Sequence, residues 1–462
     1  MSDYSKRLGR LRPAPENFLT AEQIAQVQGG RRDFLRRAFT AASATMVAGG
    51  AASAYGATAE ERKDWIGDKG SKFILDKPEW GTTLGKPVDE PPYGVPSKYE
   101  ANLVRRISPG LAAVNQANVA FAPLQGMFGI ITPSGLHFNR SHQGWYDIDP
   151  AQHRLMVMGE KGLVKNPKVY TVGDIMRMQP VSRIHFIECG ANSAMEWGNV
   201  AVPTVQYTHG MVSCSEFTGV PLIKLLEDCG ANLNGVRFIM AEGADGSHEN
   251  RTIPMSLVLS GEVLVAYGQN GEMLRPENGY PMRLVVPGVE GVSQIKYLRR
   301  IKLGTTPFAA KDEVLGYVDL MPDGKLRQYT SVMECKSVIT SPSGGQVLMD
   351  KGVYNVTGIA WSGRGKIKRV DVSFDGGSSW QQARIEGPVQ NKALTRFNIP
   401  WVWNGKAAFL QSRAVDETGM VQPTYQELRK VRGTRSVYHN NAIQTWQVEE
   451  TGDVRNVQLA NS

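Results

Sequence analysis

The stretch from Val338 to about Lys430 restricts the fold most, because it consists of short alternating segments bounded by turn residues. Val370–Phe374 alternates apolar and polar side chains, and Asp375-Gly376-Gly377 supplies a hairpin turn after it. Regular short strands of this kind predict an immunoglobulin-like β-sandwich. We expect its core to contain three aromatic side chains, Trp361, Trp380 and Phe397.

The preceding region, from Ser108 to about Thr306, mixes two kinds of pattern. Short apolar runs predict strands at Phe186-Ile187, Val236–Met240 and Arg283–Pro287. Helical periodicity predicts helices at Thr171–Met178 and Gly219–Asp228. The fold class is therefore predicted as α+β, with a mixed α/β domain over residues 108–330, a β-sandwich over 331–435 and a tail over 436–462.

The first 59 residues have the composition of an export signal. Paired arginines at Arg31-Arg32 precede Phe34-Leu35, and residues 38–59 carry no charge and are rich in Ala, Gly, Ser and Thr. This pattern predicts a twin-arginine signal with small-residue cleavage candidates at 52–54 and 57–59. The alternative is a membrane anchor, but the apolar part is short and weakly hydrophobic for a span of about 20 residues. We therefore expect no membrane span, and we expect residues 60–107, which are charged and proline-rich, to form an extended arm.

Export by this route places the mature protein in the periplasm. The route carries folded proteins and is used by enzymes that receive a complex cofactor in the cytoplasm. Without residues 1–59, which hold eight Lys and Arg against four Asp and Glu, the formal charge of +8 falls to near +4. A mildly basic chain without a Lys/Arg-rich run gives no indication of nucleic-acid binding.

Four cysteines occur, Cys189, Cys214, Cys229 and Cys335, and none forms a C-x-x-C or C-x-x-C-H motif. The sequence thus predicts no c-type haem in this chain. Cys189 follows an apolar run and precedes Gly-Ala-Asn192, so a single thiolate there suits a soft metal. The alternative for Cys189 is a buried, inert thiol, and for the other three it is buried thiols or one disulfide of unknown pairing.

Four segments, in this order, carry a resemblance to a known family. They are Phe138-Asn-Arg-Ser-His142, Cys189-Gly-Ala-Asn192, Tyr280–Gly291 with Gln294-Ile-Lys296, and Arg413-Ala-Val-Asp416. Together they make the region from about Ser108 to Gln422 similar to the sulfite oxidase family of molybdenum enzymes. Within that family, Thr208–Pro221 is most similar to the catalytic molybdenum subunit of the sulfane dehydrogenases in bacterial sulfur-oxidising (Sox) systems.

The resemblance implies one molybdenum per chain, held by a pyranopterin (molybdopterin) and by the thiolate of Cys189. A dithiolene supplies most of the coordination, so a second protein ligand is not required. Arg140 and Tyr317 fall at catalytic positions of the family; the alternative for Tyr317 is a packed side chain. By the family pattern, the cofactor contacts fall on Phe138, Asn139, Arg140, Ser141, His142, Asp245, Asn278, Arg283, Gln294, Ile295 and Lys296.

The sequence departs from the family at two places. Asn278 stands where the family has a histidine that contacts the cofactor, and Ser193 and Ala194 stand where sulfite oxidases have two arginines that bind sulfite. Each charge-assisted hydrogen bond from such a guanidinium is worth about 1.5–3 kcal/mol. We therefore expect weak binding of free sulfite and a pocket suited to a sulfur atom on a carrier.

The resemblance then implies oxidation of the sulfane sulfur of a cysteine persulfide on a sulfur-carrier protein, within thiosulfate oxidation. Electrons would pass to a c-type dihaem cytochrome subunit, and the sandwich would form a homodimer, which gives a heterotetramer with the cytochrome. Three alternatives remain: a periplasmic sulfite dehydrogenase, a molybdenum reductase of oxidised methionines, and a secreted binding protein with an adhesion module. Arg413 reaches an active site across the dimer or is a surface charge of the sandwich.

Overall fold

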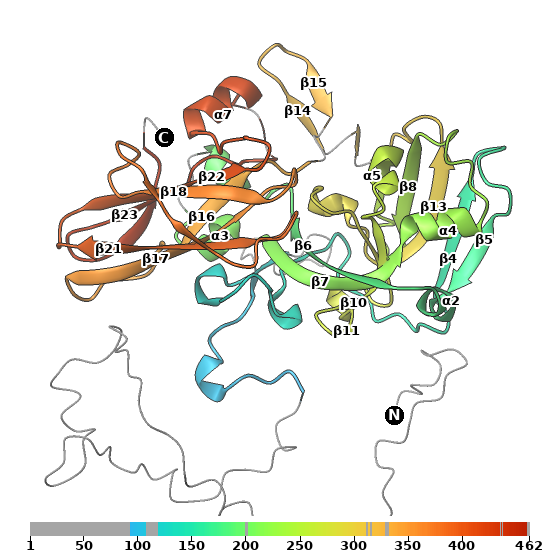
Figure 1. The fold of residues 1–462 in the computed structure, drawn as a ribbon, viewed down its shortest axis with the longest axis horizontal. Helices are drawn as coiled ribbons and strands as arrows, with labels where there is room; N and C mark the ends of the chain where they lie inside the picture. Colours follow the sequence, from blue (N-terminus) through green and yellow to red (C-terminus); the bar gives the residue numbers. More distant parts are fainter. Residues whose placement is uncertain are drawn as a thin grey trace, which may run out of the picture. The chain divides into compact units, whose positions relative to one another are not determined.

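The computed structural model describes residues 93–107, 119–198, 202–310, 313–314, 317–328, 332–434, 436 and 438–459. The predicted export signal and residues 60–92 of the predicted arm lie outside the described residues. The described residues from Lys98 onward belong to one compact unit that is rich in strands and poor in helices (Figure 1). This agrees with the predicted α+β class.

The first part of the unit contains two five-stranded sheets. One has the order β11-β10-β7-β6, with β12 also paired to β10: Val181–Glu188 (β6), Val212–Pro221 (β7), Leu264–Gln269 (β10), Glu272–Met273 (β11) and Arg283–Val285 (β12). The other has the order β5-β4-β13-β8-β9: Arg154–Gly159 (β4), Lys168–Thr171 (β5), Phe238–Gly243 (β8), Asn250–Pro254 (β9) and Leu298–Gly304 (β13). Its β4–β13 pair is parallel. A small sheet joins Arg106–Ile107 (β1), Val119–Phe121 (β2) and Asn139–Arg140 (β3).

The helices of this part are short, and those at 172–177, 222–228 and 255–259 pack apolar residues into its core. They are Val172–Arg177 (α2), Val205–His209 (α3), Leu222–Asp228 (α4) and Met255–Leu259 (α5), with single 3₁₀ turns at Lys98–Glu100, Leu124–Gly126, Ser134–Leu136, Ala194–Gly198, Pro276–Asn278 and Gly291–Ser293. Helix α2 begins where Thr171 and Asp174 form a capping box, which satisfies two free backbone N–H groups. The predicted helix at 219–228 starts three residues late, because Gly219–Pro221 still pair with β10.

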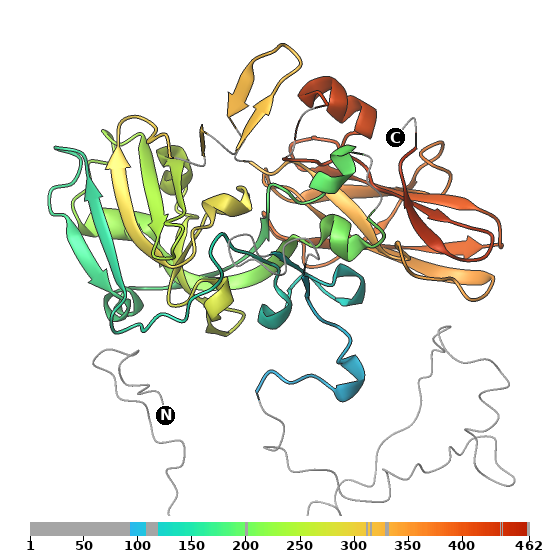
Figure 2. The ribbon, with the colours of Figure 1, turned by 180° about the vertical axis from the view of Figure 1, so that it is seen from behind.

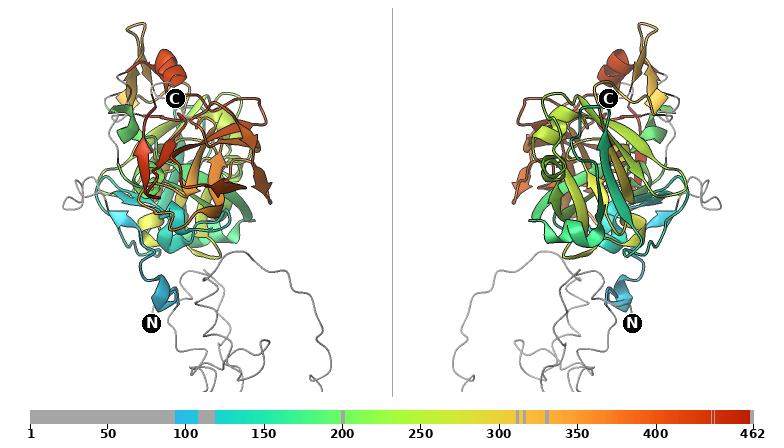
Figure 3. Two further views of the ribbon diagram at one scale, coloured as in Figure 1. Left: turned by 90° about the vertical axis from the view of Figure 1, so that its left-hand side faces the viewer. Right: turned by 90° about the vertical axis from the view of Figure 1, so that its right-hand side faces the viewer.

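The second part is a β-sandwich, as predicted. Its first sheet has the order β16-β17-β21-β20: Lys336–Ser341 (β16), Gly352–Trp361 (β17), Arg384–Glu386 (β20) and Thr395–Trp403 (β21). Its second has the order β19-β18-β22-β23-β24: Ile367–Ser373 (β18), Gln381–Gln382 (β19), Ala408–Asp416 (β22), Thr445–Val448 (β23) and Val454–Val457 (β24). The segment 436–462, expected as a tail, thus supplies β23 and β24 to the sandwich. Figure 3 shows the sandwich strands facing the viewer in one panel and the strands of the other part in the other.

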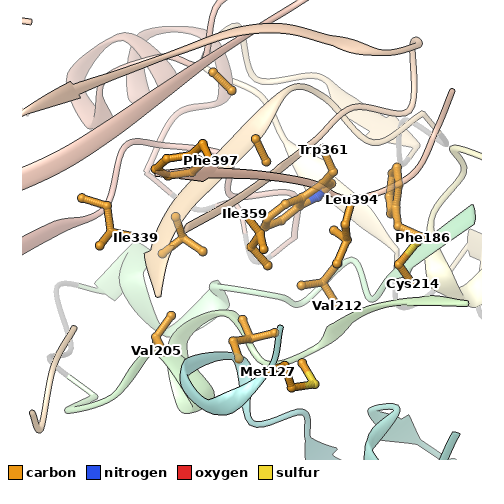
Figure 4. Packing of buried hydrophobic residues seen from close by; sticks show 14 of the residues in the cluster. Met127, Phe186, Val205, Val212, Cys214, Ile339, Ile359, Trp361, Leu394 and Phe397 are labelled. Atoms are coloured by element: carbon orange, nitrogen blue, oxygen red, sulfur yellow. The ribbon is translucent and has the colours of Figure 1, made fainter. Parts of the chain in front are cut away.

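The two parts share one hydrophobic core. Phe186, Val212 and Cys214 from the β6–β7 pair pack in the same cluster as Trp361 and Phe397 of the sandwich (Figure 4). These five side chains are at most 1% exposed. Burial of this extent is worth about 25 cal/mol per Å² of apolar surface, so the sandwich and the first part stabilise each other. A second cluster lies within the first part, around Leu155, Leu222 and Ile301.

Trp380 corrects the expected aromatic core. Trp361 and Phe397 are fully buried, but Trp380 is partly exposed. Its indole N–H donates to the carbonyl of Gly377, and the guanidinium of Arg413 lies 4.3 Å from its ring centre. Gly376 and Gly377 both have positive φ in the turn at 375–377. The hydrogen bond to this turn keeps the indole outside the core of the sandwich. Arg413 also pairs with Asp371, so within this chain it is a surface charge of the sandwich.

The hairpin Val318–Leu320 (β14) and Leu326–Gln328 (β15) lies beside helix Tyr425–Arg432 (α7), as the view from behind also shows (Figure 2). Arg432 of α7 joins the two through Asp319, with Nη1 3.7 Å from Oδ2. All four cysteines are free thiols, which excludes the expected alternative of a disulfide among them. Within the described residues, no helix is long and apolar enough to cross a membrane.

Candidate active site

The predicted site residues line one cavity with about 760 Å³ of empty space, part of it open to solvent. They come from β3 and its flanks, from the end of β6, from the loop after β8, and from β12 and the segments on either side of it, and Tyr317 comes from the residue before β14. The cavity is lined by all thirteen: Phe138, Asn139, Arg140, Ser141, His142, Cys189, Asp245, Asn278, Arg283, Gln294, Ile295, Lys296 and Tyr317. Their roles toward a cofactor remain predictions.

Cys189 lies at the end of β6, where its N–H donates to the carbonyl of Met211 over 3.0 Å. Burial raises the pKa of the thiol to about 11, although the charge of Arg140 acts in the opposite direction. The free thiol is therefore protonated at neutral pH. A coordinated soft metal displaces that proton, since a metal-bound thiol is deprotonated.

Two glycines allow the cysteine loop to lie close to the turn at 290–293. A Cβ atom on Gly190 would collide with the carboxyl of Glu290. A Cβ atom on Gly291 would lie 2.8 Å from the carbonyl oxygen of Glu188 and 3.1 Å from Cα of Cys189. Because the second contact is with backbone, a side chain at Gly291 would displace the cysteine.

A buried polar network fixes the same loop from behind. Glu188 is 1% exposed, and its carboxylate accepts from Lys336 Nζ (3.1 Å), Asn192 Nδ2 (3.0 Å) and Trp361 Nε1 (2.6 Å). Lys336 Nζ also donates to Ser193 Oγ over 2.9 Å. Lys336 and Trp361 belong to the sandwich, so the second part holds the cysteine loop of the first. The ammonium of Lys336 also occupies the surroundings of Ser193, one of the positions where the family has arginine.

The segment expected as a tail contacts this loop as well. The N–H of His439 donates to the carbonyl of Gly190 over 2.8 Å, and Asn440 Nδ2 donates to the carbonyl of Ser193 over 3.3 Å. Tyr438 stacks on Tyr317, with ring centres 4.7 Å apart. Residues 438–440 therefore form part of the site's support.

Three cationic side chains face the cavity, Arg140, Arg283 and Lys296. Burial lowers the pKa of Lys296 to about 7, with a further contribution from Arg283, and its Nζ donates to Asn139 Oδ1 and to the carbonyl of Glu277. Burial lowers the pKa of Arg283 to about 10. Its two terminal nitrogens donate to the carbonyls of Asn278 and Gln294. Such buried cations are stabilised by an anion such as phosphate.

The polar side chains that were predicted to contact the cofactor also contact other groups of the protein. Asp245 accepts from Ser247 Oγ through one carboxylate oxygen, and Asn278 Nδ2 donates to the carbonyl of Ser134. His142 lies 3.5 Å from Glu249 Oε2. The amide of Gln294 bonds the backbone of Val286 and Val289, so its side chain shapes the turn after β12.

Tyr317 lines the cavity together with Cys189 and contacts a buried arginine through its ring. The guanidinium of Arg251 lies 4.4 Å from the centre of the Tyr317 ring. Burial raises the pKa of the Tyr317 phenol, so it is protonated and able to donate a hydrogen bond at neutral pH.

The sequence reasoning missed several residues of this region. His137, Glu249 and Glu277 line the cavity, and Arg251, Glu290 and Tyr438 lie around Tyr317 or the cysteine loop. Burial lowers the pKa of His137 to about 3 and raises that of Glu290 well above its usual range. His137 precedes a motif that was recognised and Glu290 lies inside another, so both had a local signal. Arg251 and Tyr438 had none.

The donors and acceptors present fit a molybdopterin. Among the described side chains, Arg283 Nε is a buried donor and Asp245 Oδ1 a buried acceptor without hydrogen-bond partners. These atoms suit a phosphate or carbonyl oxygen and the amino group of a pterin, respectively. The described residues contain no group of three or more His, Cys, Asp and Glu suited to a metal.

Comparisons with known proteins agree with this site. The family model of the oxidoreductase molybdopterin binding domain matches residues 142–311, and that of the Mo-co oxidoreductase dimerisation domain matches residues 327–446. Mitochondrial sulfite oxidase from Mus musculus is 29% identical over 343 residues, and NADH nitrate reductase from Solanum lycopersicum is 29% identical over 340 residues. The matches cover 68% and 64% of this chain, but only 62% and 36% of those relatives.

A solved structure is similar over a larger share of the chain. The sulfane dehydrogenase SoxCD from Paracoccus pantotrophus superposes with a TM-score of 0.80 at 44% identity, covering 82% of this chain and 97% of that one. The predicted fold class and the predicted molybdenum–pyranopterin cofactor are thereby confirmed. The chain belongs to the sulfite oxidase family of molybdenum oxidoreductases.

Proposed function

We propose that this enzyme oxidises the sulfane sulfur of a cysteine persulfide held on a carrier protein. The observation that carries the proposal is the surroundings of Cys189, where Ser193 and Ala194 replace the two arginines of sulfite oxidases and Ser193 accepts from Lys336. Without those guanidiniums, a small dianion loses its bidentate partners. The 44% identity to a sulfane dehydrogenase supports the same substrate class.

The reaction balances as follows. The terminal persulfide sulfur gains three oxygen atoms from three water molecules and becomes a sulfonate, releasing six protons and six electrons. When bound, the molybdenum cofactor supplies two-electron oxidation of sulfur with water as the oxygen source. A c-type dihaem cytochrome accepts the electrons.

The residues of this chain bind the cofactor and move protons. Arg140, Arg283 and Lys296 hold the anionic cofactor, while Asp245 and Asn278 contact the pterin edge; Cys189 anchors the metal. Tyr317 orients the sulfur substrate and passes a proton between substrate and solvent, for which its protonated phenol is suited. Arg140, close enough to Cys189 to affect its thiol, attracts the negative end of the persulfide.

A match to one family model supports a proposed assembly. The C-terminal domain, which matches a dimerisation model over residues 327–446, forms a homodimer, and each chain binds one cytochrome subunit to give a heterotetramer. The twin-arginine pattern at Arg31-Arg32 directs the folded protein to the periplasm, where it meets the cytochrome and the carrier.

A kinetic comparison tests this function. The purified holoenzyme is assayed with one cytochrome acceptor and with either free sulfite or a carrier cysteine persulfide. We expect kcat/KM for the carrier-bound sulfane sulfur to exceed that for sulfite by at least 100-fold. Equal or faster turnover of free sulfite would instead identify a sulfite dehydrogenase, which the similarity to mitochondrial sulfite oxidases makes the second candidate.

A further inference from the structure

A second cavity adjoins the first behind Tyr317. It has about 660 Å³ of empty space, part of it open to solvent, and is lined by residues of β8, β9 and the turn at 290–293 together with Pro307, Glu313 and Tyr317. Tyr317 and Val292 line both cavities. The tyrosine that we place beside the substrate therefore forms a wall between two compartments.

Arg251 is the cation of this second cavity. It lies on β9 and is 3% exposed. One terminal nitrogen donates to the carbonyl of Asn250, and the other lies 3.1 Å from Glu249 Oε1. That ion pair lacks hydrogen-bond geometry, so Nε and Nη2 have no acceptor among the described residues. A buried guanidinium with unsatisfied donors is stabilised by a ligand that carries anionic oxygen atoms.

The surrounding carboxyl groups leave room for such a ligand. The carboxylate of Glu313 already accepts three hydrogen bonds, from the N–H and the hydroxyl of Thr252 and from the N–H of Ala310. Glu249 is shared between Arg251 and His142. Glu290 is 2% exposed, and its Oε1 has no hydrogen-bond partner among the described residues.

We propose that Arg251 is a specificity-determining residue that binds the sulfonate formed on the carrier's sulfur, with the second cavity as the compartment that receives it. This inference rests on the proposed function, in which oxidation of the carrier's persulfide makes the sulfonate. Arg251 lies on β9 with its guanidinium against the face of Tyr317, so it serves the second cavity and does not replace the two arginines beside Cys189. It favours the oxidised product, because neither the thiol nor the persulfide of the carrier has oxygen atoms for a guanidinium to bind.

The binding of S-sulfocysteine, which carries the product group, tests this assignment. Its Kd for the holoenzyme is measured by calorimetry for the wild type, Arg251→Met and Arg251→Lys. We expect the Kd to rise at least tenfold in Arg251→Met, a loss of about 1.4 kcal/mol, and to rise less in Arg251→Lys. A Kd in Arg251→Met within twofold of the wild type would overturn the assignment.

Two controls separate this result from other failures. Arg300→Met removes another arginine of the same sheet that pairs with a glutamate, Glu242, and lines neither cavity; its Kd should match the wild type, and an equal weakening would overturn the assignment. Turnover of carrier persulfide by the wild type tests the proposed function separately. A wild type that binds S-sulfocysteine through Arg251 but oxidises only free sulfite would overturn the proposed function and leave the anion site in place.

Discussion

Removing the ammonium of Lys336 tests whether the sandwich holds the cysteine loop. Lys336 and Glu188 are 2% and 1% exposed, and Lys336 donates to Glu188, Ser193 and the carbonyl of Asn192. Lys336→Met leaves the carboxylate of Glu188 buried with the donors of Asn192 and Trp361 only. Breaking a buried ion pair in this way costs about 3–5 kcal/mol, and we expect a loss of that size in the free energy of unfolding.

The double variant separates the pair from its surroundings. Glu188→Gln with Lys336→Met removes both charges, so we expect it to be more stable than Lys336→Met alone by about 1.5 kcal/mol or more. Urea unfolding of the cofactor-free protein, followed by tryptophan fluorescence, measures the free energy of unfolding of both variants. Trp361, which donates to Glu188, lies within the network and contributes to this signal. Lys325→Met, which removes an exposed lysine beside Asp323, is the control and should change little. A loss below about 1 kcal/mol in Lys336→Met, or simple additivity in the double variant, would refute the reasoning.

Three further predictions concern the cavity itself. Tyr317→Phe removes the phenol proton, and we expect kcat to fall about 100-fold with KM within threefold of the wild type; unchanged kcat would exclude a proton-transfer role. Burial lowers the pKa of Lys296 to about 7, from its usual 10.5. Above pH 7 the unfolded chain therefore binds more protons at this residue than the folded chain does. The melting temperature of the cofactor-free protein should then rise from pH 7 to 8.5. Lys296→Met should abolish this rise of the melting temperature with pH. If the variant shows the same rise as the wild type, the rise comes from other titratable groups. Gly291→Ala forces Cα of Cys189 and the carbonyl of Glu188 to move, so we expect molybdenum content to fall below half. Gly387→Ala, at a glycine with open space and without positive φ, should leave it unchanged.

The sequence predicted the architecture well where the local pattern and the tertiary role coincide. The strand at Val370 and the turn after it form β18 and its hairpin with β19, because alternation and Gly376-Gly377 act locally. Trp380 was wrongly expected in the core, since the sequence of a turn does not say whether an aromatic side chain beside it points to the core or to solvent. The helix expected from Gly219 begins at Leu222 because pairing with β10 overrides helical periodicity there.

The candidate site was likewise predicted only where a sequence motif marks its residues. The family motifs locate Cys189, Phe138–His142 and Gln294–Lys296, and these do meet in one cavity. Arg251 and Tyr438 follow no motif, since each reaches the site only through the pairing of β9 with β8 or the return of the chain after α7. The clamp of Lys336 on Glu188 spans 148 residues of sequence, a separation at which neither periodicity nor spacing carries information.

The bond between Cys189 and molybdenum is the central claim, and X-ray absorption at the molybdenum edge measures it most directly. Holoenzyme from a molybdenum-replete host is compared with Cys189→Ser, with the metal content of each determined by elemental analysis. We predict about one molybdenum per chain in the wild type, and one fewer sulfur ligand on any molybdenum that Cys189→Ser retains. An unchanged sulfur count in Cys189→Ser, or a wild type devoid of molybdenum, would contradict the account.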